Sequence, residues 1–394
     1  MVFHIGLVEL ISYWKSVFSP KVIIKCGNLD EKQIEWFKKL YYSGLGELMY
    51  TNNLKVQFQD FMQIETKGKK VDITRGVEKI NKEDYSGYIV PIGGGKDSIV
   101  TLENLPLNKQ TDYCLILNPK QVTKECARTA GFQELNVIEI YRNIDPNLLE
   151  LNKQGFINGH TPFSSLLSFL TYFIGFLTHK KYITLSNESS ANESNVAGEK
   201  INHQYSKTYE YENDFYDYSN KYLKLPIRYF SFLRPLNELQ IAMLFSKYEK
   251  YHSIFKSCNV GSKEKEWIWC GHCPKCLFVF SILSPFLYKD KLINIFEKDL
   301  FEDESLTKTF IELNGYGEVK PFECVGTFEE MRFAISKTIK NLEDKGKELP
   351  YLLRYYKEHF ELMNLEIDIT KRYNNQNNLP EDLNTILKEA IFND

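Results

Sequence analysis

The sequence lacks a strong excess of charge of either sign. Its 394 residues include 49 Lys and Arg against 52 Asp and Glu, which is a formal net charge of −3. This balance offers no electrostatic reason to wrap a nucleic-acid backbone, so we predict no nucleic-acid partner. The length allows two or three domains with a large buried core.

Long hydrophobic runs and internal repeats are also missing. The longest apolar run, residues 163–177, is short for a membrane span and is interrupted by Ser and Thr, so it predicts a buried helix. The first ten residues contain His4 and Glu9 and have no basic flank before an apolar stretch, which argues against a signal peptide. We therefore expect no membrane association and a cytoplasmic location.

Predicted strands and helices alternate from Gly87 onward, a pattern typical of a parallel sheet with crossover helices. Strands are expected at residues 88–92, 113–117, 137–141 and 182–185, and helices at 97–105, 121–130, 162–178 and 237–245. Ligands of such sheets bind beyond the carboxyl ends of the strands. The sequence therefore predicts an α/β fold with a Rossmann-like parallel sheet and a ligand crevice at that end.

The N-terminal region, residues 1–85, does not follow this alternation. It contains β-like stretches at 21–25 and 54–64 and a predicted helix at 30–42. We interpret it as a small α+β unit.

Two other regions also depart from the alternation. Residues 202–222 are dense in Tyr, Glu, Asp and Asn, and are expected to form a long polar insertion at the mouth of the crevice. Residues after 290 are predicted to be mostly helical, with an Asn-rich break at 374–378. The predicted division of the chain is 1–85, 86–290 and 291–394.

A glycine triplet follows the first strand of the alternation and continues into Lys-Asp-Ser. The six residues are Gly93, Gly94, Gly95, Lys96, Asp97 and Ser98. Glycines let backbone N–H groups converge on an anion, and the N-terminus of the next helix favours negative charge there. Lys96 adds positive charge, Asp97 is suited to hold Mg²⁺, and Ser98 is expected to cap the helix and donate to a phosphate. The pattern predicts a phosphate cradle, with a spacing different from Walker A.

Two further loops are expected at the same end of the sheet. Asn187 and Glu188 follow the strand at 182–185, and Arg234 precedes the helix at 237–245. An arginine here is suited to neutralise phosphate charge, although a solvated loop is an equal alternative for Arg234. We predict that Asn187 and Arg234 contribute to the nucleotide site.

Four of the eight cysteines form one cluster with the spacing C-x11-C-x2-C-x2-C. They are Cys258, Cys270, Cys273 and Cys276. This spacing suits a tetrahedral metal better than disulfides, so we predict a structural Zn²⁺ knuckle over residues 258–276. An iron–sulfur cluster is the competing interpretation, and His272 within the knuckle is an alternative ligand.

The remaining cysteines do not share this spacing. Cys26, Cys114 and Cys126 lie on apolar segments and are expected to fill the core. Cys324 lies in a loop-like context and remains a candidate site residue.

The loop Gly93–Ser98 resembles the S-G-G-x-D-S loop of the PP-loop ATP pyrophosphatases, which split ATP into AMP and pyrophosphate. Gly93 stands where that pattern usually has Ser. A PP-loop followed by a four-cysteine knuckle also resembles the 7-cyano-7-deazaguanine synthases, which adenylate a carboxylate. The resemblance implies a fold of PP-loop (adenine nucleotide alpha hydrolase-like) type that uses ATP, Mg²⁺ and Zn²⁺.

A larger set of motifs is similar to the ATP-dependent UDP-N-acetylmuramoyl-L-alanyl-L-glutamate epimerase family of peptidoglycan precursor synthesis. The motifs are Gly93–Ser98, Ser186–Glu193, Asn202–Lys207, Leu233–Leu236, Trp269–Cys276 and Lys320–Gly326. The resemblance implies inversion of the terminal L-Glu of UDP-MurNAc-L-Ala-L-Glu to D-Glu through carboxylate adenylation, with AMP and pyrophosphate released.

Inversion of a carbon centre usually needs two acid–base groups on opposite faces. Candidates are His203 and Lys207, which share a face if their segment is helical, with Glu188 or Cys324 opposite. His203 as a structural residue, Lys207 as a ligand of a phosphate or carboxylate, and Glu188 as a ligand of Mg²⁺ or ribose are the alternatives.

Two other functions fit the same motifs. One is a carboxylate-adenylating amide or nitrile synthase of the deazaguanine type, which would deliver ammonia to the adenylate. The other is a non-catalytic ATP-sensing zinc module. A PP-loop tRNA thiolase fits less well, because the chain is slightly acidic. The oligomeric state does not follow from the sequence.

Overall fold

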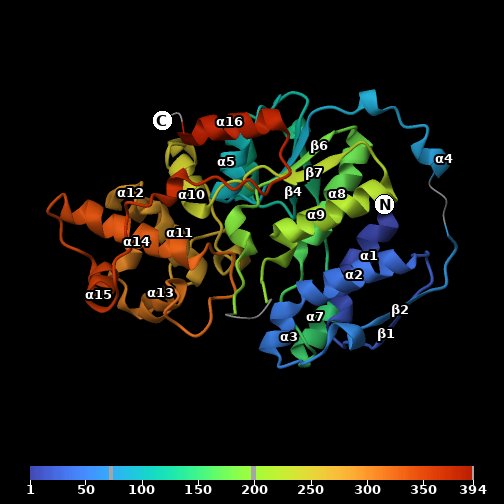
Figure 1. Cartoon of the computed structure of the whole chain (residues 1–394), viewed down its shortest axis with the longest axis horizontal. Coiled ribbons are helices and arrows are strands. Elements are labelled where there is room, and N and C mark those ends of the chain that lie inside the picture. Colours follow the sequence, from blue (N-terminus) through green and yellow to red (C-terminus); the bar gives the residue numbers. More distant parts are fainter. Residues whose placement is uncertain (71–73, 197–200, 393–394) are drawn as a thin grey trace. The chain divides into compact units, whose positions relative to one another are not determined.

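The computed structural model describes residues 1–70, 74–196 and 201–392 (Figure 1). The strands are β1 Lys21–Ile24, β2 Gln63–Thr66, β3 Tyr88–Pro91, β4 Tyr113–Leu117, β5 Val137–Ile140, β6 Tyr182–Leu185 and β7 Arg228–Ser231. The α-helices are α1 Val2–Trp14, α2 Glu31–Gly44, α3 Gly46–Thr51, α4 Thr74–Val77, α5 Lys96–Asn104, α6 Gln121–Thr129, α7 Pro146–Lys153, α8 Phe163–Thr178, α9 Tyr209–Tyr218, α10 Glu238–Ser246, α11 Pro274–Leu283, α12 Lys289–Phe296, α13 Thr307–Leu313, α14 Phe328–Glu343, α15 Tyr351–His359 and α16 Glu381–Phe392.

The chain forms two compact units, each assembled from separate segments. The first comprises Met1–Ile89, Arg142–Ile183 and Val196–Tyr229, and the second comprises Val90–Tyr141, Thr184–Asn195 and Phe230–Asp394. Strands β3, β6 and β7 each begin in the first unit and end in the second. The loops that follow these three strands therefore all belong to the second unit. The predicted division at residues 85 and 290 stays a prediction.

The central sheet has the strand order β5-β4-β3-β6-β7. Its pairs β3–β6 and β4–β5 are parallel, with Tyr88 opposite Tyr182 and Cys114 opposite Val137. Most residues of β3, β4 and β6 are buried, as expected for parallel strands with both faces covered. The predicted α/β fold with a parallel sheet is confirmed, whereas the assignment to the PP-loop type stays a prediction. Strand β7 was not predicted.

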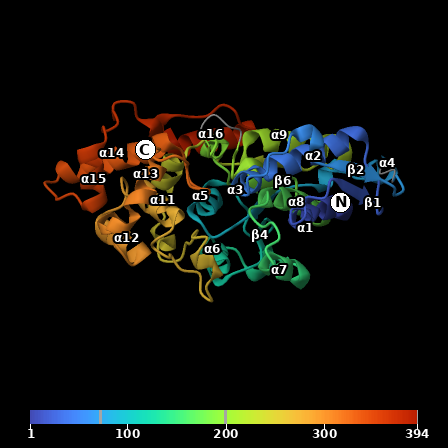
Figure 2. The same ribbon diagram turned by 90° about the horizontal axis from the view of Figure 1, so that it is seen from below.

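The first unit contains a second, two-stranded sheet and an aromatic core. Strands β1 and β2 pair in parallel, and helix α1 packs against α2 and α8. Figures 1 and 2 both show α1 and α2 beside β1 and β2. His4, Phe37 and Phe169 stack in the core, where burial lowers the pKa of His4 to about 4.

Three expectations for this unit were wrong. The stretch 54–64 is not a strand, because residues 58–60 form a 3-10 turn and β2 begins only at Gln63. The stretch 202–222 is not a polar insertion, because it contains α9 and buries Phe215 against Phe169. Cys26 is exposed instead of filling the core, while Cys114 and Cys126 are buried as predicted.

The second unit continues from the sheet into a helical C-terminal region, as predicted. Helix α11 is buried from Lys275 to Leu283 and packs against α10, α12, α13 and α14. Helices α11 to α15 lie together in both views. The predicted apolar helix at 162–178 is α8, in the first unit. Among the described residues, no helix combines the length and hydrophobicity required to cross a bilayer.

Helix α2 begins with a capping box, close to the predicted helix start at residue 30. The side chain of Asp30 accepts a hydrogen bond from the Gln33 N–H (2.8 Å), and the Gln33 side chain accepts one from the Asp30 N–H (3.1 Å). These bonds satisfy backbone donors that have no partner within the helix.

We expect Asp30→Ala to destabilise the start of α2 by about 1 kcal/mol, because the Gln33 amide loses its acceptor. Hydrogen exchange of the first-turn amides of α2 should accelerate correspondingly. Asp30→Asn is the matched control, since it retains an oxygen acceptor and should exchange nearly as slowly as the wild type. Equal exchange in both variants would contradict this account of the cap.

Candidate active site

Three loops meet at the carboxyl ends of the adjacent strands β3, β6 and β7. The Thr101 hydroxyl in α5 donates to the Ser186 hydroxyl after β6 (2.8 Å). The Ser189 N–H donates to the Leu236 carbonyl after β7 (2.9 Å). All four residues lie in the second unit, so the predicted convergence of these loops is present there.

The glycine loop turns from β3 into α5 through a conformation that favours glycine. Gly94 has φ +79°, and a Cβ atom there would lie 3.1 Å from the Cγ1 atom of Val122. Its carbonyl accepts a hydrogen bond from the Lys256 N–H (3.0 Å), which fixes the loop from outside. The N-cap of α5 is Gly95. Ser98 does not cap the helix as predicted: it lies in the first turn and its hydroxyl donates back to the Gly95 carbonyl (2.9 Å).

Lys96 is buried in the second unit and forms ion pairs with two carboxylates. Its side chain is 2 % exposed, and its ammonium group contacts both Asp97 and Glu238. Burial alone would lower the pKa of Lys96, but the two carboxylates outweigh burial and raise it. Lys96 is therefore a charged group held at the base of the glycine loop, while Asp97 is partly exposed.

Glu238, the partner of Lys96, forms a pair of buried acids with Glu330. Burial raises the pKa of Glu238 to about 7, although the charge of Lys96 opposes the shift. Burial also raises the pKa of Glu330, whose carboxylate accepts hydrogen bonds from the Glu238 N–H (2.7 Å) and the Ser190 hydroxyl. Glu330 is in addition the third residue of α14 and accepts from the Thr327 N–H (2.5 Å). One side chain thus joins α14 to the loops after β6 and β7.

Arg234 and Asn187 hold neighbouring loops together. Arg234 is fully buried, so the alternative of a solvated loop is wrong. Its guanidinium donates to the Glu188 carbonyl (2.7 Å), and the Asn187 amide donates to the Ser231 hydroxyl (3.0 Å). Glu188 is itself 5 % exposed.

The motif Lys320–Gly326 contacts the segment that follows β6. Lys320 is buried and forms an ion pair with Glu193 (2.6 Å). The Asn195 amide donates to the Pro321 carbonyl (3.1 Å). A Cβ atom on Gly326 would lie 3.0 Å from the Cγ atom of Glu238, so a glycine allows this loop to reach the buried acids.

The cysteine knuckle also reaches this loop. Lys275, which is buried in the first turn of α11, donates to the carbonyl of Cys324. The Cys324 side chain is half-buried. The sequence did not predict three of these site residues, Lys275, Glu238 and Glu330, because burial and long-range contacts decide their role. Their sequence signals are weak: Lys275 lies within a motif, Glu238 lies just after one, and Glu330 belongs to the capping box of α14.

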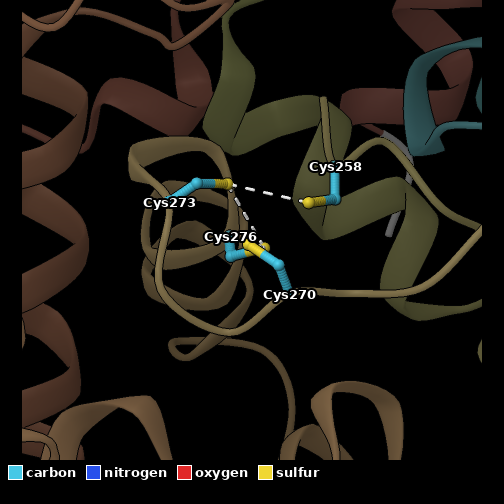
Figure 3. Close-up of side chains that lie close together, drawn as sticks. All are labelled: Cys258, Cys270, Cys273 and Cys276. Carbon is cyan, nitrogen blue, oxygen red and sulfur yellow. Dashed lines mark hydrogen bonds between the residues drawn. The ribbon is translucent and has the colours of Figure 1, made fainter. Parts of the chain in front are cut away.

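The four clustered cysteines bring their sulfur atoms together (Figure 3). The Sγ–Sγ distances are 3.7 Å for Cys258 and Cys273, 3.7 Å for Cys270 and Cys276, and 3.5 Å for Cys273 and Cys276. A tetrahedron with Zn–S bonds of about 2.3 Å separates its sulfurs by about 3.8 Å, so the cluster could bind one zinc ion. His272 is exposed and outside the set, which excludes it as the fourth ligand in this arrangement.

The two other predicted acid–base candidates lie in the first unit. His203 forms a hydrogen bond through Nδ1 with Glu47, and its ring centroid is 4.0 Å from that of His160. Lys207 ends the 3-10 turn Tyr205–Lys207, so His203 and Lys207 do not share a helix as the prediction required. Burial, together with the nearby charges of His203, Lys207 and Lys15, lowers the pKa of His160 to about 3.

Comparison with known families gives matches over most of the chain. The model of the MurL N-terminal domain matches residues 1–232, and that of the MurL C-terminal domain matches residues 254–361. A UDP-N-acetyl-alpha-D-muramoyl-L-alanyl-L-glutamate epimerase of Xanthomonas oryzae pv. oryzae is 33% identical over 345 residues, which cover 86% of this chain and 74% of the relative. A Micromonospora protein of the same name is 33% identical over 348 residues, covering 87% and 75%. One from Salinispora tropica is 33% identical over 330 residues, covering 83% and 70%.

We expect Cys276→Ser to abolish tight metal binding at the knuckle and to unfold this part of the second unit, because structural zinc contributes on the order of 10 kcal/mol in small domains. Cys126→Ser is the matched control, since Cys126 is equally buried but outside the cluster. The measurement is thiolate-to-metal charge-transfer absorption after loading with Co²⁺. An unchanged band in Cys276→Ser would rule out the knuckle as the thiolate site.

Proposed function

The chain belongs to the UDP-N-acetylmuramoyl-L-alanyl-L-glutamate epimerase family and is thus an enzyme of the isomerase class, and from this premise we propose that it inverts L-Glu in UDP-MurNAc-L-Ala-L-Glu by an ATP-dependent route. The substrate class is a small nucleotide-sugar peptide. The proposal rests first on family membership over most of the chain. It rests also on the glycine loop, which leads into helix α5 and its buried, charged first residue, Lys96.

The chemical problem is the weak acidity of the α-proton. A free carboxylate beside that carbon is a poor electron sink, so a protein base cannot remove the proton efficiently. In the proposed first step, an oxygen of the glutamate carboxylate attacks the α-phosphorus of ATP. The bond between the α-phosphorus and the oxygen of the β-phosphate breaks and releases pyrophosphate. In the resulting acyl-adenylate, the former carboxylate no longer carries a negative charge.

The loop Gly93–Ser98 is the proposed cradle for the phosphates. Backbone N–H groups at the start of α5 and the charge of Lys96 favour an anion there, Asp97 would hold Mg²⁺, and Mg²⁺ would supply charge neutralisation at the phosphates. Asn187 and Arg234, which are fixed by their hydrogen bonds, support the neighbouring loops of the proposed nucleotide site. The cysteine knuckle would hold Zn²⁺ as a structural ion, which is consistent with its sulfur spacing.

The inversion itself would follow activation. A base takes the α-proton and the electron pair is delocalised into the activated carbonyl. Because this glutamate is N-acylated by alanine, its amide oxygen could attack the activated carbonyl and expel AMP, and the α-carbon of the resulting oxazolone would be still more acidic. A proton then returns to the other face. Water finally hydrolyses the activated carbonyl to the D-Glu carboxylate, either by displacing AMP from the adenylate or by opening the oxazolone from which AMP has already left.

Two acid–base groups are needed, one for each face. For one group we propose His203 or Lys207, and for the other Glu188 or Cys324. The hydrogen bond between His203 and Glu47 orients the imidazole, and Glu188 is shielded from solvent, which supports these two residues as candidates.

The function is tested by incubating the protein with UDP-MurNAc-L-Ala-L-Glu, ATP and Mg²⁺ in D₂O. We expect D-Glu after hydrolysis of the product, one α-deuterium per inverted residue, and AMP and pyrophosphate in step with inversion. Omission of ATP is the control and should stop all three. Inversion at an equal rate without ATP would refute the adenylation route, and an amide product on adding ammonium would favour a synthase.

A second prediction concerns the pH dependence of ATP binding. Because burial raises the pKa of Glu238 to about 7, its carboxyl is increasingly protonated below pH 7 and no longer competes with phosphates for Lys96. We therefore expect ATP to bind several-fold more tightly as pH falls from 8 to 6, measured by calorimetry. Glu238→Gln should remove this dependence. Glu329→Gln, at an exposed neighbour of Glu330, should leave it intact. A pH-independent affinity in the wild type would contradict the proposed competition.

A further inference from the structure

Three potential metal ligands converge in the first unit. Their donor atoms differ from those of the cysteine knuckle, and they lie in other parts of the sequence. They are Glu47 on α3, His160 in the segment between α7 and α8, and His203 just before the 3-10 turn at 205–207. One donor atom from each lies within 4.8 Å of the other two. The side chains of His203 and Glu47 are only 10% and 16% exposed, so solvent has restricted access to them.

We propose that Glu47, His160 and His203 form a binding site for a divalent transition-metal ion such as Zn²⁺. Two imidazole nitrogens and one carboxylate oxygen are a common ligand set for such ions, and three protein ligands leave a coordination position for water or an anion. This site goes beyond the proposed function, and it differs from the knuckle by having nitrogen and oxygen donors instead of sulfur.

The geometry requires only small adjustments to accept an ion. A tetrahedral site with bonds of about 2.0–2.1 Å separates its donor atoms by about 3.4 Å, and the three donors are already grouped within 4.8 Å. The hydrogen bond between His203 Nδ1 and Glu47 would be replaced, because the metal takes the place of the shared proton. The side chain of His160, whose ring lies 4.0 Å from that of His203, is already held there by a hydrogen bond to the His203 backbone.

Glycines allow the segments that carry the three ligands to approach one another closely. A Cβ atom on Gly159 would lie 3.2 Å from the Cδ1 atom of Leu48, which is the neighbour of Glu47 on α3. A Cβ atom on Gly46 would lie 3.9 Å from the Cα atom of Ile201, two residues before His203. Both histidine-bearing segments therefore pack directly on the start of α3.

A buried lysine anchors the segment that carries His160. Lys15 is 7 % exposed, and its ammonium group donates to the Gly159 carbonyl (2.6 Å) and to the Asn158 side-chain oxygen (2.9 Å). These bonds hold the two residues immediately before His160. A ligand set supported in this way is pre-organised, which favours metal affinity.

The proposal narrows the choice between the two acid–base candidates of this unit. A ring nitrogen of His203 bound to a metal no longer exchanges protons with a substrate. Lys207 then becomes the candidate acid–base group of the segment, and His203 becomes a ligand.

The test counts metal ions per chain in the untagged protein. After treatment with a chelator and reloading with Co²⁺, we expect two equivalents in the wild type, one with thiolate charge-transfer absorption and one without it. His160→Ala should retain one equivalent and the full thiolate band. His359→Ala, at an exposed histidine of α15, should retain two equivalents.

Glu47→Gln separates a loss of metal binding from a folding defect, because the substitution preserves the size of the side chain and its capacity for hydrogen bonding. We expect the affinity of the non-thiolate site for Zn²⁺, measured by competition with a chromophoric chelator, to fall at least ten-fold with the thiolate site unchanged. A wild type that binds one equivalent, entirely through thiolates, would overturn the proposal. A second equivalent that persists in both His160→Ala and Glu47→Gln would overturn it as well.

Discussion

A buried ammonium group requires carboxylates beside it, and this requirement organises the second unit. Lys96 is almost fully buried at the start of α5, and Glu238 at the start of α10 is its partner. Because an unpaired buried charge is strongly destabilising, the ion pair holds the loops after β3 and β7 at a fixed separation. Glu330 extends the constraint to α14 by accepting from the Glu238 backbone and from Ser190.

This arrangement places two buried acids and a buried lysine at the base of the candidate active site. Glu238 and Glu330 are both buried, and burial is the largest cause of their raised pKa values. In addition, the charge of Glu238 raises the pKa of Glu330, and the charges of Asp97 and Glu188 raise the pKa of Glu238. A triphosphate placed against such a surface needs compensating charge from Mg²⁺, from Lys96 and from the N-terminus of α5. The acids thus make occupancy of the proposed phosphate cradle dependent on protonation and on the cation.

The two proposed metal centres have different physical roles. The knuckle joins Cys258 to the start of α11 through four sulfurs, a closed set that suits a structural ion. Glu47, His160 and His203 come from three separate segments of the first unit, so an ion there would tie α3 to both histidine-bearing segments. Three ligands leave that ion open to exchange with solvent or an anion, whereas the knuckle leaves no open position.

Local patterns in the sequence were sufficient for the strands β3, β4, β5 and β6, for helix α2 and for the cysteine set, because each depends on neighbouring residues or on ligand spacing. The motifs also indicated which loops carry the candidate site. Strand β7 was missed because only the two central residues of Arg228–Ser231 are apolar, so the strand forms no apolar run in the sequence. Cys26 was misplaced because an apolar neighbourhood does not determine exposure.

Tertiary structure alone decided which polar groups are buried and which partners they have. The local sequence around Arg234 is compatible with an exposed loop and with a buried position. Only the packing of α10 and of the loop after β6 decides that the side chain is buried. The pairing of Lys96 with Glu238, and the approach of His160 to His203, join residues far apart in sequence. No local propensity encodes such contacts, since they arise when whole elements pack and exclude water between them.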